Sequence, residues 1–195
     1  MTRDGLLKHL EKNFSKEIVA AFSKVKREDF VEEKYKQYAY EDRPLPIGDN
    51  ATISQPTTIA FMLDLLDLKN NQKILEIGSG CGYVLELMSY LSLNSIIYGI
   101  EINEDVFFQS KKIIKKNNIH LINDSGINGL KAAAPFDRIL VSAAFFDEPI
   151  HLLDQLTDDG ILVVPVGNYI YKYNQKKKET YYGFAFVNVQ GEQDA

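Results

Sequence analysis

The chain has 195 residues, of which 45% are hydrophobic and 25% charged, with 12 glycines and 6 prolines. This balance is typical of a globular domain and excludes a disordered, collagen-like or low-complexity protein. A net charge of −5 and a pI near 5.3 argue against a non-specific nucleic-acid binder, so no nucleic-acid partner is expected. Cys81 is the single cysteine, and no Cys/His cluster has zinc-ligand spacing, so we expect no disulfide and no bound metal.

The first residues lack the hydrophobic region of a signal peptide, and no apolar run approaches the roughly 20 residues that a membrane helix needs. We therefore expect a cytoplasmic protein without a membrane partner, acting as a monomer.

The first 45 residues have the spacing of apolar side chains that is typical of helices. Two such stripes, from Leu6 to Phe14 and from Ile18 to Val25, predict two short helices. The segment 43–50 contains two Pro, a Gly, an Asp and an Asn, which is typical of a loop. The pattern at Ile59, Met62, Leu63 and Leu66 then predicts an amphipathic helix, whose start is marked by Ser54 and Pro56.

From residue 73 onward short apolar runs alternate with helical patterns. Strands are expected at 73–78, 95–101, 119–123, 136–142 and 161–166, with helices after the glycines at 78–82, after Asn103 and near 149–156. This alternation predicts a Rossmann-like α/β fold, in which a mostly parallel twisted sheet carries helices on both faces. The runs at 169–173 and 181–189 predict a terminal antiparallel hairpin.

No linker or internal repeat divides the chain, so we expect one domain. Its parts are a helical segment at about 1–45, a core at about 54–167 and a hairpin at about 168–190.

A glycine-rich loop, Gly78-Ser79-Gly80-Cys81-Gly82, follows the first expected strand, where α/β sheets bind ligands. Glycines let the backbone turn tightly and approach a ligand. A dinucleotide fingerprint would place its third glycine at position 83, which is Tyr83, so a nicotinamide dehydrogenase is disfavoured.

Two acidic residues favour S-adenosylmethionine as the ligand of this loop. Glu101 ends the second expected strand, where a carboxylate can accept hydrogen bonds from both ribose hydroxyls. Glu76 lies two residues before the first glycine and suits a ligand with a cationic amine and a sulfonium. Taken alone, either residue is also explained as a strand-end acid, satisfied by backbone N–H groups or by water.

Several segments, in order from about residue 25 to residue 168, resemble the protein-L-isoaspartate O-methyltransferase family. The distinctive ones are Leu45-Pro46-Ile47-Gly48 and Thr52-Ile53-Ser54-Gln55-Pro56, which general methyltransferases lack. Further similarity lies in 25–31, in the loop 75–83, and in the strands at 136–144 and 156–167.

The resemblance implies a class I methyltransferase that transfers a methyl group from S-adenosylmethionine to the free carboxylate of L-isoaspartyl residues in damaged proteins or peptides. It implies Ser54 as the catalytic residue, which donates a hydrogen bond to the substrate carboxylate, and Ile53, Ser54, Ala143 and Ala144 as substrate-binding residues. The implied cofactor-binding residues are Thr52, Gln55, Glu76, Gly78, Ser79, Gly80, Gly82, Glu101, Asp124 and Gly126.

The chain departs from the family pattern on the expected peptide side of the site. Asp49-Asn50-Ala51 follows Gly48, Phe145-Phe146 follows Ala144, and Asn188 stands where the family has a proline. The Asp-Gly pair of the family becomes Asp124-Ser125-Gly126. These departures are expected to act on substrate affinity and to leave the cofactor side intact.

The reaction that the resemblance implies needs no general base, because a carboxylate with a pKa near 4 is already ionised. Accordingly His9, His120 and His151 lie away from the motifs. For Ser54 a second interpretation stands beside the catalytic one, since Ser before Gln-Pro and an apolar helix is typical of an N-cap.

Two further functions remain open. One is another class I methyltransferase, acting on a small molecule or RNA, although Ser142-Ala143-Ala144-Phe145 lacks the Asp/Asn-Pro-Pro-aromatic tetrad of enzymes that methylate nucleic-acid amines. The other is a non-enzymatic paralogue that only binds an adenosyl ligand.

Overall fold

The computed structural model describes residues 1–48, 51–174 and 177–189. Its α-helices are α1 (Arg3–Leu10), α2 (Lys16–Lys24), α3 (Pro56–Leu66), α4 (Tyr83–Leu91) and α5 (Glu104–Ile113). Its 3₁₀ helices are η1 (Arg27–Phe30), η2 (Glu33–Tyr38), η3 (Lys131–Ala133) and η4 (Ile150–Gln155). Its strands are β1 (Leu45–Gly48), β2 (Ala51–Ile53), β3 (Lys73–Ile77), β4 (Ile96–Glu101), β5 (Ile119–Asn123), β6 (Phe136–Val141), β7 (Leu156–Val166), β8 (Tyr169–Asn174) and β9 (Lys177–Tyr182).

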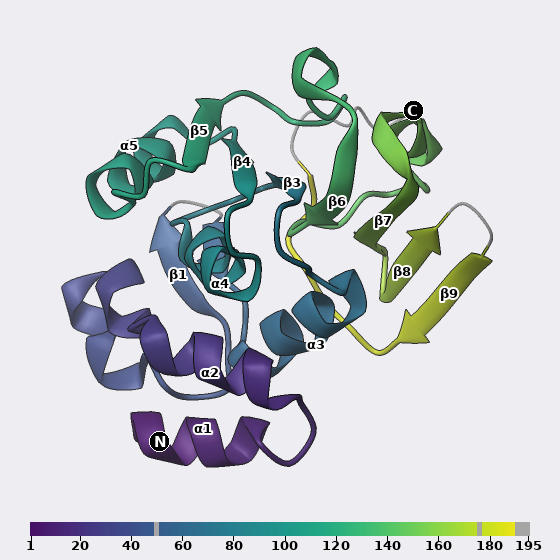
Figure 1. Cartoon of the computed structure of the whole chain (residues 1–195). Coiled ribbons are helices and arrows are strands. Elements are labelled where there is room, and N and C mark those ends of the chain that lie inside the picture. Colours follow the sequence, from purple (N-terminus) through teal and green to yellow (C-terminus); the bar gives the residue numbers. More distant parts are fainter. Residues whose placement is uncertain (49–50, 175–176, 190–195) are drawn as a thin grey trace.

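A seven-stranded sheet runs through the molecule in the order β5-β4-β3-β6-β7-β8-β9 (Figure 1). Strands β3 to β7 are parallel to one another, and β8 and β9 add an antiparallel hairpin at the β7 edge. From β3 the chain first builds β4 and β5 on one side and then β6 and β7 on the other. The strand order therefore reverses between β3 and β6, which is where such sheets bind ligands. The predicted mostly parallel sheet and the terminal hairpin are confirmed.

Both faces of the sheet are buried, because successive side chains of a strand point to opposite faces. In β3, Ile74 packs among residues of α1 to α5, and Leu75 packs on the other face with residues of β6, β7 and η4. Burial on both faces explains why these strands are nearly all apolar. The prediction of helices on both faces is confirmed, with the second face covered by the 3₁₀ helices η3 and η4 and by loops. The structure contains no helix, within the described ranges, that is long and apolar enough to cross a membrane.

Three elements differ from the sequence predictions. The segment predicted as a loop at 43–50 contains β1, which pairs with β2 in a small antiparallel hairpin. The helix predicted near 149–156 is the 3₁₀ helix η4. The last strand was predicted at 181–189 but is β9, which ends before Gly183, whose φ of +104° turns the chain.

The chain beyond Gly183 returns to the centre of the sheet. The backbone N–H of Ala144 donates to Val187 O, and that of Val189 donates to Ala144 O, both at 2.8 Å. This C-terminal return (residues 184–189) passes the carboxyl end of β6, where Figure 1 shows it in yellow.

Candidate active site

Two adjoining cavities lie at the carboxyl ends of β3 and β6, beside the β1–β2 hairpin. The first has about 480 Å³ of empty space and the second about 620 Å³, both including the part that is open to solvent. Both are lined by Ile47, Thr52, Gly78, Gly80 and Ser142. The first extends to Ser54, Glu76 and Ser79, the second to Glu101, Ala143 and the C-terminal return.

The glycine loop forms the floor between the two cavities. The N–H groups of Gly78 and Ser79 both donate to Ile100 O at 2.9 Å, which ties the loop to the end of β4. Gly80 has a φ of +53°, and a Cβ at this position would lie 3.0 Å from Ile47 Cδ1. A side chain here would therefore be strained and would occupy the space between the loop and β1. Gly82 is the N-cap of α4 and does not line the described cavities.

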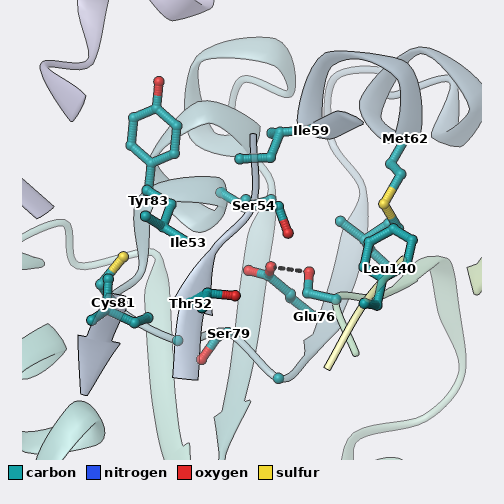
Figure 2. Close-up of a pocket in the computed structure, with 16 residues that line it drawn as sticks. Thr52, Ile53, Ser54, Ile59, Met62, Glu76, Ser79, Cys81, Tyr83 and Leu140 are labelled. Atoms are coloured by element: carbon teal, nitrogen blue, oxygen red, sulfur yellow. Dashed lines mark hydrogen bonds between the residues drawn. The ribbon is translucent and has the colours of Figure 1, made fainter. Parts of the chain in front are cut away.

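Glu76 is the most unusual side chain of the site, because its carboxyl group is buried with only one partner. It points to the helix face of the sheet, where Ser142 Oγ donates to its Oε1 at 2.6 Å (Figure 2). Its Oε2 is buried and has no hydrogen-bond partner among the described residues. Burial raises the pKa of Glu76 to about 8; the hydrogen bond from Ser142 opposes the rise and the nearby Glu101 adds to it. An orphaned carboxylate oxygen at a cavity suits a cationic group of a ligand.

Glu101 is held by the backbone rather than left to solvent. Its Oε2 accepts from Gly80 N and its Oε1 from Asn103 N, both at 2.8 Å. It is 7% exposed and lines the second cavity. A carboxylate offers about four acceptor positions, so two remain for the hydroxyls of a ligand.

Ser54 lies just beyond the end of β2, and Figure 2 shows it beside the first cavity. The interpretation of Ser54 as a helix cap is wrong. The N-cap of α3 is Gln55, which makes no side-chain cap hydrogen bond. The cap is supplied from elsewhere in the chain, since Asp42 Oδ1 accepts from Thr57 N at 2.8 Å. The hydroxyl of Ser54 is therefore not engaged in capping.

The remaining predicted residues lie in different parts of the site. Thr52 and Ile53 line the first cavity, and Ala143 lines the second. Gln55 borders a further pocket, which Ser54 also lines. Ala144 is buried and instead holds the C-terminal return through its backbone.

Asp124 and Gly126, which are predicted to bind the cofactor, flank a residue that lines the second cavity. Asp124 is exposed, and its carboxylate accepts from Ser125 N at 2.6 Å. Gly126 is buried under Ile77 and Ile100. The residue of this segment that lines the second cavity is Ser125.

The residues that depart from the family pattern lie in different places, some at the cavities and some away from them. Ala51 and Asn188 do line the cavities, together with Val187, whereas Asp49 and Asn50 lie outside the described residues. Phe145 packs in the core beneath Val166 and lines no described cavity, while Phe146 is exposed. The expectation that 145–146 lines the peptide side is therefore wrong for Phe145.

Sequence reasoning missed Ser142, which holds Glu76 and lines both cavities. Its signal was a polar residue directly after an apolar strand, at the edge where the other ligand-facing residues cluster. Burial raises the pKa of the Cys81 thiol to about 12, which favours the protonated form, and the residue lines the first cavity.

Comparison with known proteins decides between the methyltransferase classes. The family model described as Protein-L-isoaspartate(D-aspartate) O-methyltransferase matches residues 1–188. The chain belongs to this family. The protein-L-isoaspartate O-methyltransferase of Methanothrix thermoacetophila is 39% identical over 173 residues, covering 87% of this chain and 82% of the relative. That of Dictyoglomus thermophilum is 37% identical over 190 residues, covering 91% and 85%.

Solved structures share the fold. A protein-L-isoaspartate O-methyltransferase aligns over 97% of this chain and 66% of its own length with a TM-score of 0.86 at 24% identity. A Plasmodium falciparum protein assigned the same activity, in complex with S-adenosyl-L-homocysteine, aligns over 97% and 99% with a TM-score of 0.85, also at 24% identity. The Rossmann-like class I methyltransferase fold is confirmed.

The residues present fit the cofactor of a class I methyltransferase. The orphaned Oε2 of Glu76 and the free acceptor positions of Glu101 face two joined cavities. The glycine loop between them leaves room that a Cβ at Gly80 would fill.

Proposed function

We propose that this protein methylates the free carboxylate of L-isoaspartyl residues in damaged proteins and peptides, using S-adenosylmethionine. Membership of the family supports the reaction and the cofactor. The observation that carries the proposal is the pair of joined cavities, one next to Ser54 and the other next to Glu101. The bound cofactor supplies an electrophilic methyl group on a sulfonium.

The cofactor side of the proposal rests on residues at the carboxyl ends of β3, β4 and β6. Glu101 accepts hydrogen bonds from ribose hydroxyls, and Glu76 neutralises a cationic group while Ser142 fixes its orientation. Gly78 and Gly80 allow close approach of the backbone. Thr52, Gln55, Ser79, Gly82, Asp124 and Gly126 are the further members of the proposed set, with Ser125 added by its place in the second cavity.

The substrate side rests on the β1–β2 hairpin and the C-terminal return. An open groove between them is lined by Pro46, Ala51, Thr52, Phe186 and Asn188. The proposed role of Ser54 is to donate a hydrogen bond to one carboxylate oxygen of the substrate, leaving the other oxygen free to attack in line. Ile53 and Ala143 complete the wall, and Ala144 contributes by holding the C-terminal return through its backbone.

The chain's own contribution to the rate is positioning and exclusion of water. A carboxylate is ionised at neutral pH, so the site needs no base. This fits the placement of the three histidines, none of which lines a described cavity. Holding two reacting groups in a near-attack geometry can account for several kcal/mol of the barrier. The lone buried Cys81 is compatible with a reducing cytoplasm.

The test compares an isoaspartyl peptide with its aspartyl twin in a tritiated methyl-transfer assay. The twins carry equal charge but place the free carboxylate one methylene apart, and in-line transfer tolerates little misplacement. We expect methylation of the isoaspartyl peptide alone. Ser54→Ala should lower kcat/KM about 10- to 150-fold, the loss of one hydrogen bond to a charged group.

Since Ser54 caps no helix, its replacement should leave the melting temperature nearly unchanged. Equal turnover of both peptides would point to a general carboxyl or small-molecule methyltransferase. Binding of S-adenosylhomocysteine without any turnover would indicate the non-enzymatic paralogue.

A further inference from the structure

The loop that carries Ser54 has no regular secondary structure of its own to hold it. The β1–β2 ladder ends at the pair Leu45–Ile53, and α3 begins at Pro56. Ser54 therefore lies beyond the last pair of the ladder, and backbone carbonyls at this end of β2 need partners from another part of the chain.

Arg27, on η1, supplies those partners from a fully buried position. Its Nη2 donates to Ser54 O at 3.0 Å and lies 3.4 Å from Ile53 O. The same guanidinium donates from Nη1 to Ala39 O at 2.6 Å and from Nη2 to Arg43 O at 3.2 Å. One planar group thus ties the segment 39–43 to the end of β2.

Asp42 holds the other side of the same loop. Its Oδ1 accepts from Thr57 N at 2.8 Å and its Oδ2 from Thr57 Oγ1 at 2.7 Å. The segment 39–43 therefore contacts the chain both before and after Gln55, with Ser54 between the two attachments.

We propose that Arg27 and Asp42 are positioning residues for methyl transfer, forming an N-terminal clasp that fixes Ser54 relative to the glycine loop. The inference rests on the proposed role of Ser54. Neither residue lines the two cavities, so neither touches substrate or cofactor, and both act through the backbone of 53–57. Glu76, Glu101 and the glycine loop lie on other elements, and Gln55 is the one member of the proposed cofactor set between the two attachments, so the clasp acts mainly on the substrate side.

The test separates positioning from general stability with two variants and a matched control. Arg27→Lys keeps the positive charge but loses the fork that reaches several carbonyls at once. Asp42→Ala removes a partly exposed side chain, so this variant should fold even if the buried Arg27→Lys does not. The control is Arg138→Lys, because Arg138 is also buried and donates to the carbonyls of Asp67 and Asp137, away from the cavities.

For each variant, kcat and KM are measured on the isoaspartyl peptide, together with the Kd of S-adenosylhomocysteine and the melting temperature. Asp42→Ala and Arg27→Lys should lower kcat about 10- to 100-fold, since misplacement by about 1 Å can cost that much. Their KM and Kd should stay within about threefold of the wild-type values. Arg138→Lys should lower the melting temperature and leave kcat unchanged.

Two further measurements show whether Asp42 acts through its hydrogen bonds to Thr57 or through its negative charge. Asp42→Asn keeps an oxygen for Thr57 N–H and should recover most of the kcat that Asp42→Ala loses. Amide hydrogen exchange of Thr57 should speed up in Asp42→Ala but not in Arg138→Lys.

The results that would overturn the clasp differ from those that would overturn the proposed function. A wild-type protein that turns over the isoaspartyl peptide, with Asp42→Ala and folded Arg27→Lys equally active, would overturn the clasp alone. A loss of kcat in Arg138→Lys as large as in Asp42→Ala would also overturn the clasp, because the loss would then reflect lower stability and not the position of Ser54. A wild-type protein inactive on that peptide would overturn the proposed function first.

Discussion

The buried carboxyl of Glu76 should make cofactor binding depend on pH. With a pKa of about 8, caused mainly by burial, Glu76 is largely neutral at pH 7 when no ligand is bound. A ligand with a cationic group favours the ionised form, so it lowers that pKa and releases a proton on binding. The affinity for S-adenosylhomocysteine should therefore rise as the pH rises towards 8.

The size of the change in Kd follows from the fraction of protein in which Glu76 is ionised. With a pKa of about 8, roughly 1% of Glu76 is ionised at pH 6 and about half at pH 8. Because the apparent Kd is the intrinsic Kd divided by the competent fraction, Kd should fall roughly 50-fold between pH 6 and pH 8. Isothermal titration calorimetry in two buffers with different ionisation enthalpies should show proton release near pH 7.

Three variants make the pH prediction specific to Glu76. Glu76→Gln should bind more weakly at pH 8 and lose the pH dependence. Ser142→Ala should move the dependence to higher pH, because the hydrogen bond from Ser142 lowers the pKa of Glu76. Glu86→Gln is the matched control, since Glu86 is a partly buried carboxylate that pairs with Lys116 outside the cavities. It should behave like the wild type.

The ligand-free protein offers a second readout with a defined sign. Glu76 is protonated in the folded state up to about pH 8 but ionises near pH 4.5 when unfolded. The unfolded state thus binds fewer protons between these values, so this group lowers stability as pH rises, by at most roughly 1.4 kcal/mol per pH unit. The melting temperature of Glu76→Gln relative to wild type should rise from pH 5 to pH 8. A Kd independent of pH between 6 and 8, together with a constant difference in melting temperature, would refute the reasoning.

Two further predictions concern the cofactor cavities. Gly80→Val should abolish the rise in melting temperature caused by S-adenosylhomocysteine, because the new side chain meets Ile47. Gly167→Ala is the control for backbone strain, since Gly167 has a similar φ of +55° and a Cβ there would have no neighbour within 4 Å. This control should keep the rise. In the wild type, S-adenosylhomocysteine should raise the melting temperature and NAD should not. Glu101→Ala should weaken the rise, and a shift with NAD alone would contradict the cofactor assignment.

The cofactor side of the site could be predicted because its residues follow local patterns. β3, β4 and β6 are short apolar runs between turn residues, and the carboxyl ends of parallel strands meet at one edge. This placed Gly78, Glu76 and Glu101 together before any contact was known. The partner of Glu76 could not be named, since Ser142 lies 66 residues further along the chain. Its proximity depends on the pairing of β3 with β6.

The substrate side was harder to predict because long-range contacts decide its structure. Ser54 has the sequence of an N-cap, but the capping hydrogen bond comes from Asp42, which lies 15 residues before its partner Thr57. β1 and β2 are strands of four and three residues, one containing Pro46, and such short edge strands leave little periodicity to detect. The return of 184–189 to Ala144 depends on pairing between segments that no local pattern links.

The cofactor side and the substrate side differ in how far a substitution would disturb the sheet. Changing a residue of the cofactor side alters the parallel sheet, since Glu76 and Glu101 lie within or at the ends of its strands. The substrate side is instead built on the sheet by the β1–β2 hairpin, the C-terminal return and the clasp residues Arg27 and Asp42. Ala51 and Asn188, which depart from the family pattern and line cavities, both lie there. Because both also line the second cavity beside Glu101, substitutions at these two positions can change which peptides are accepted and can also alter the fit of the cofactor.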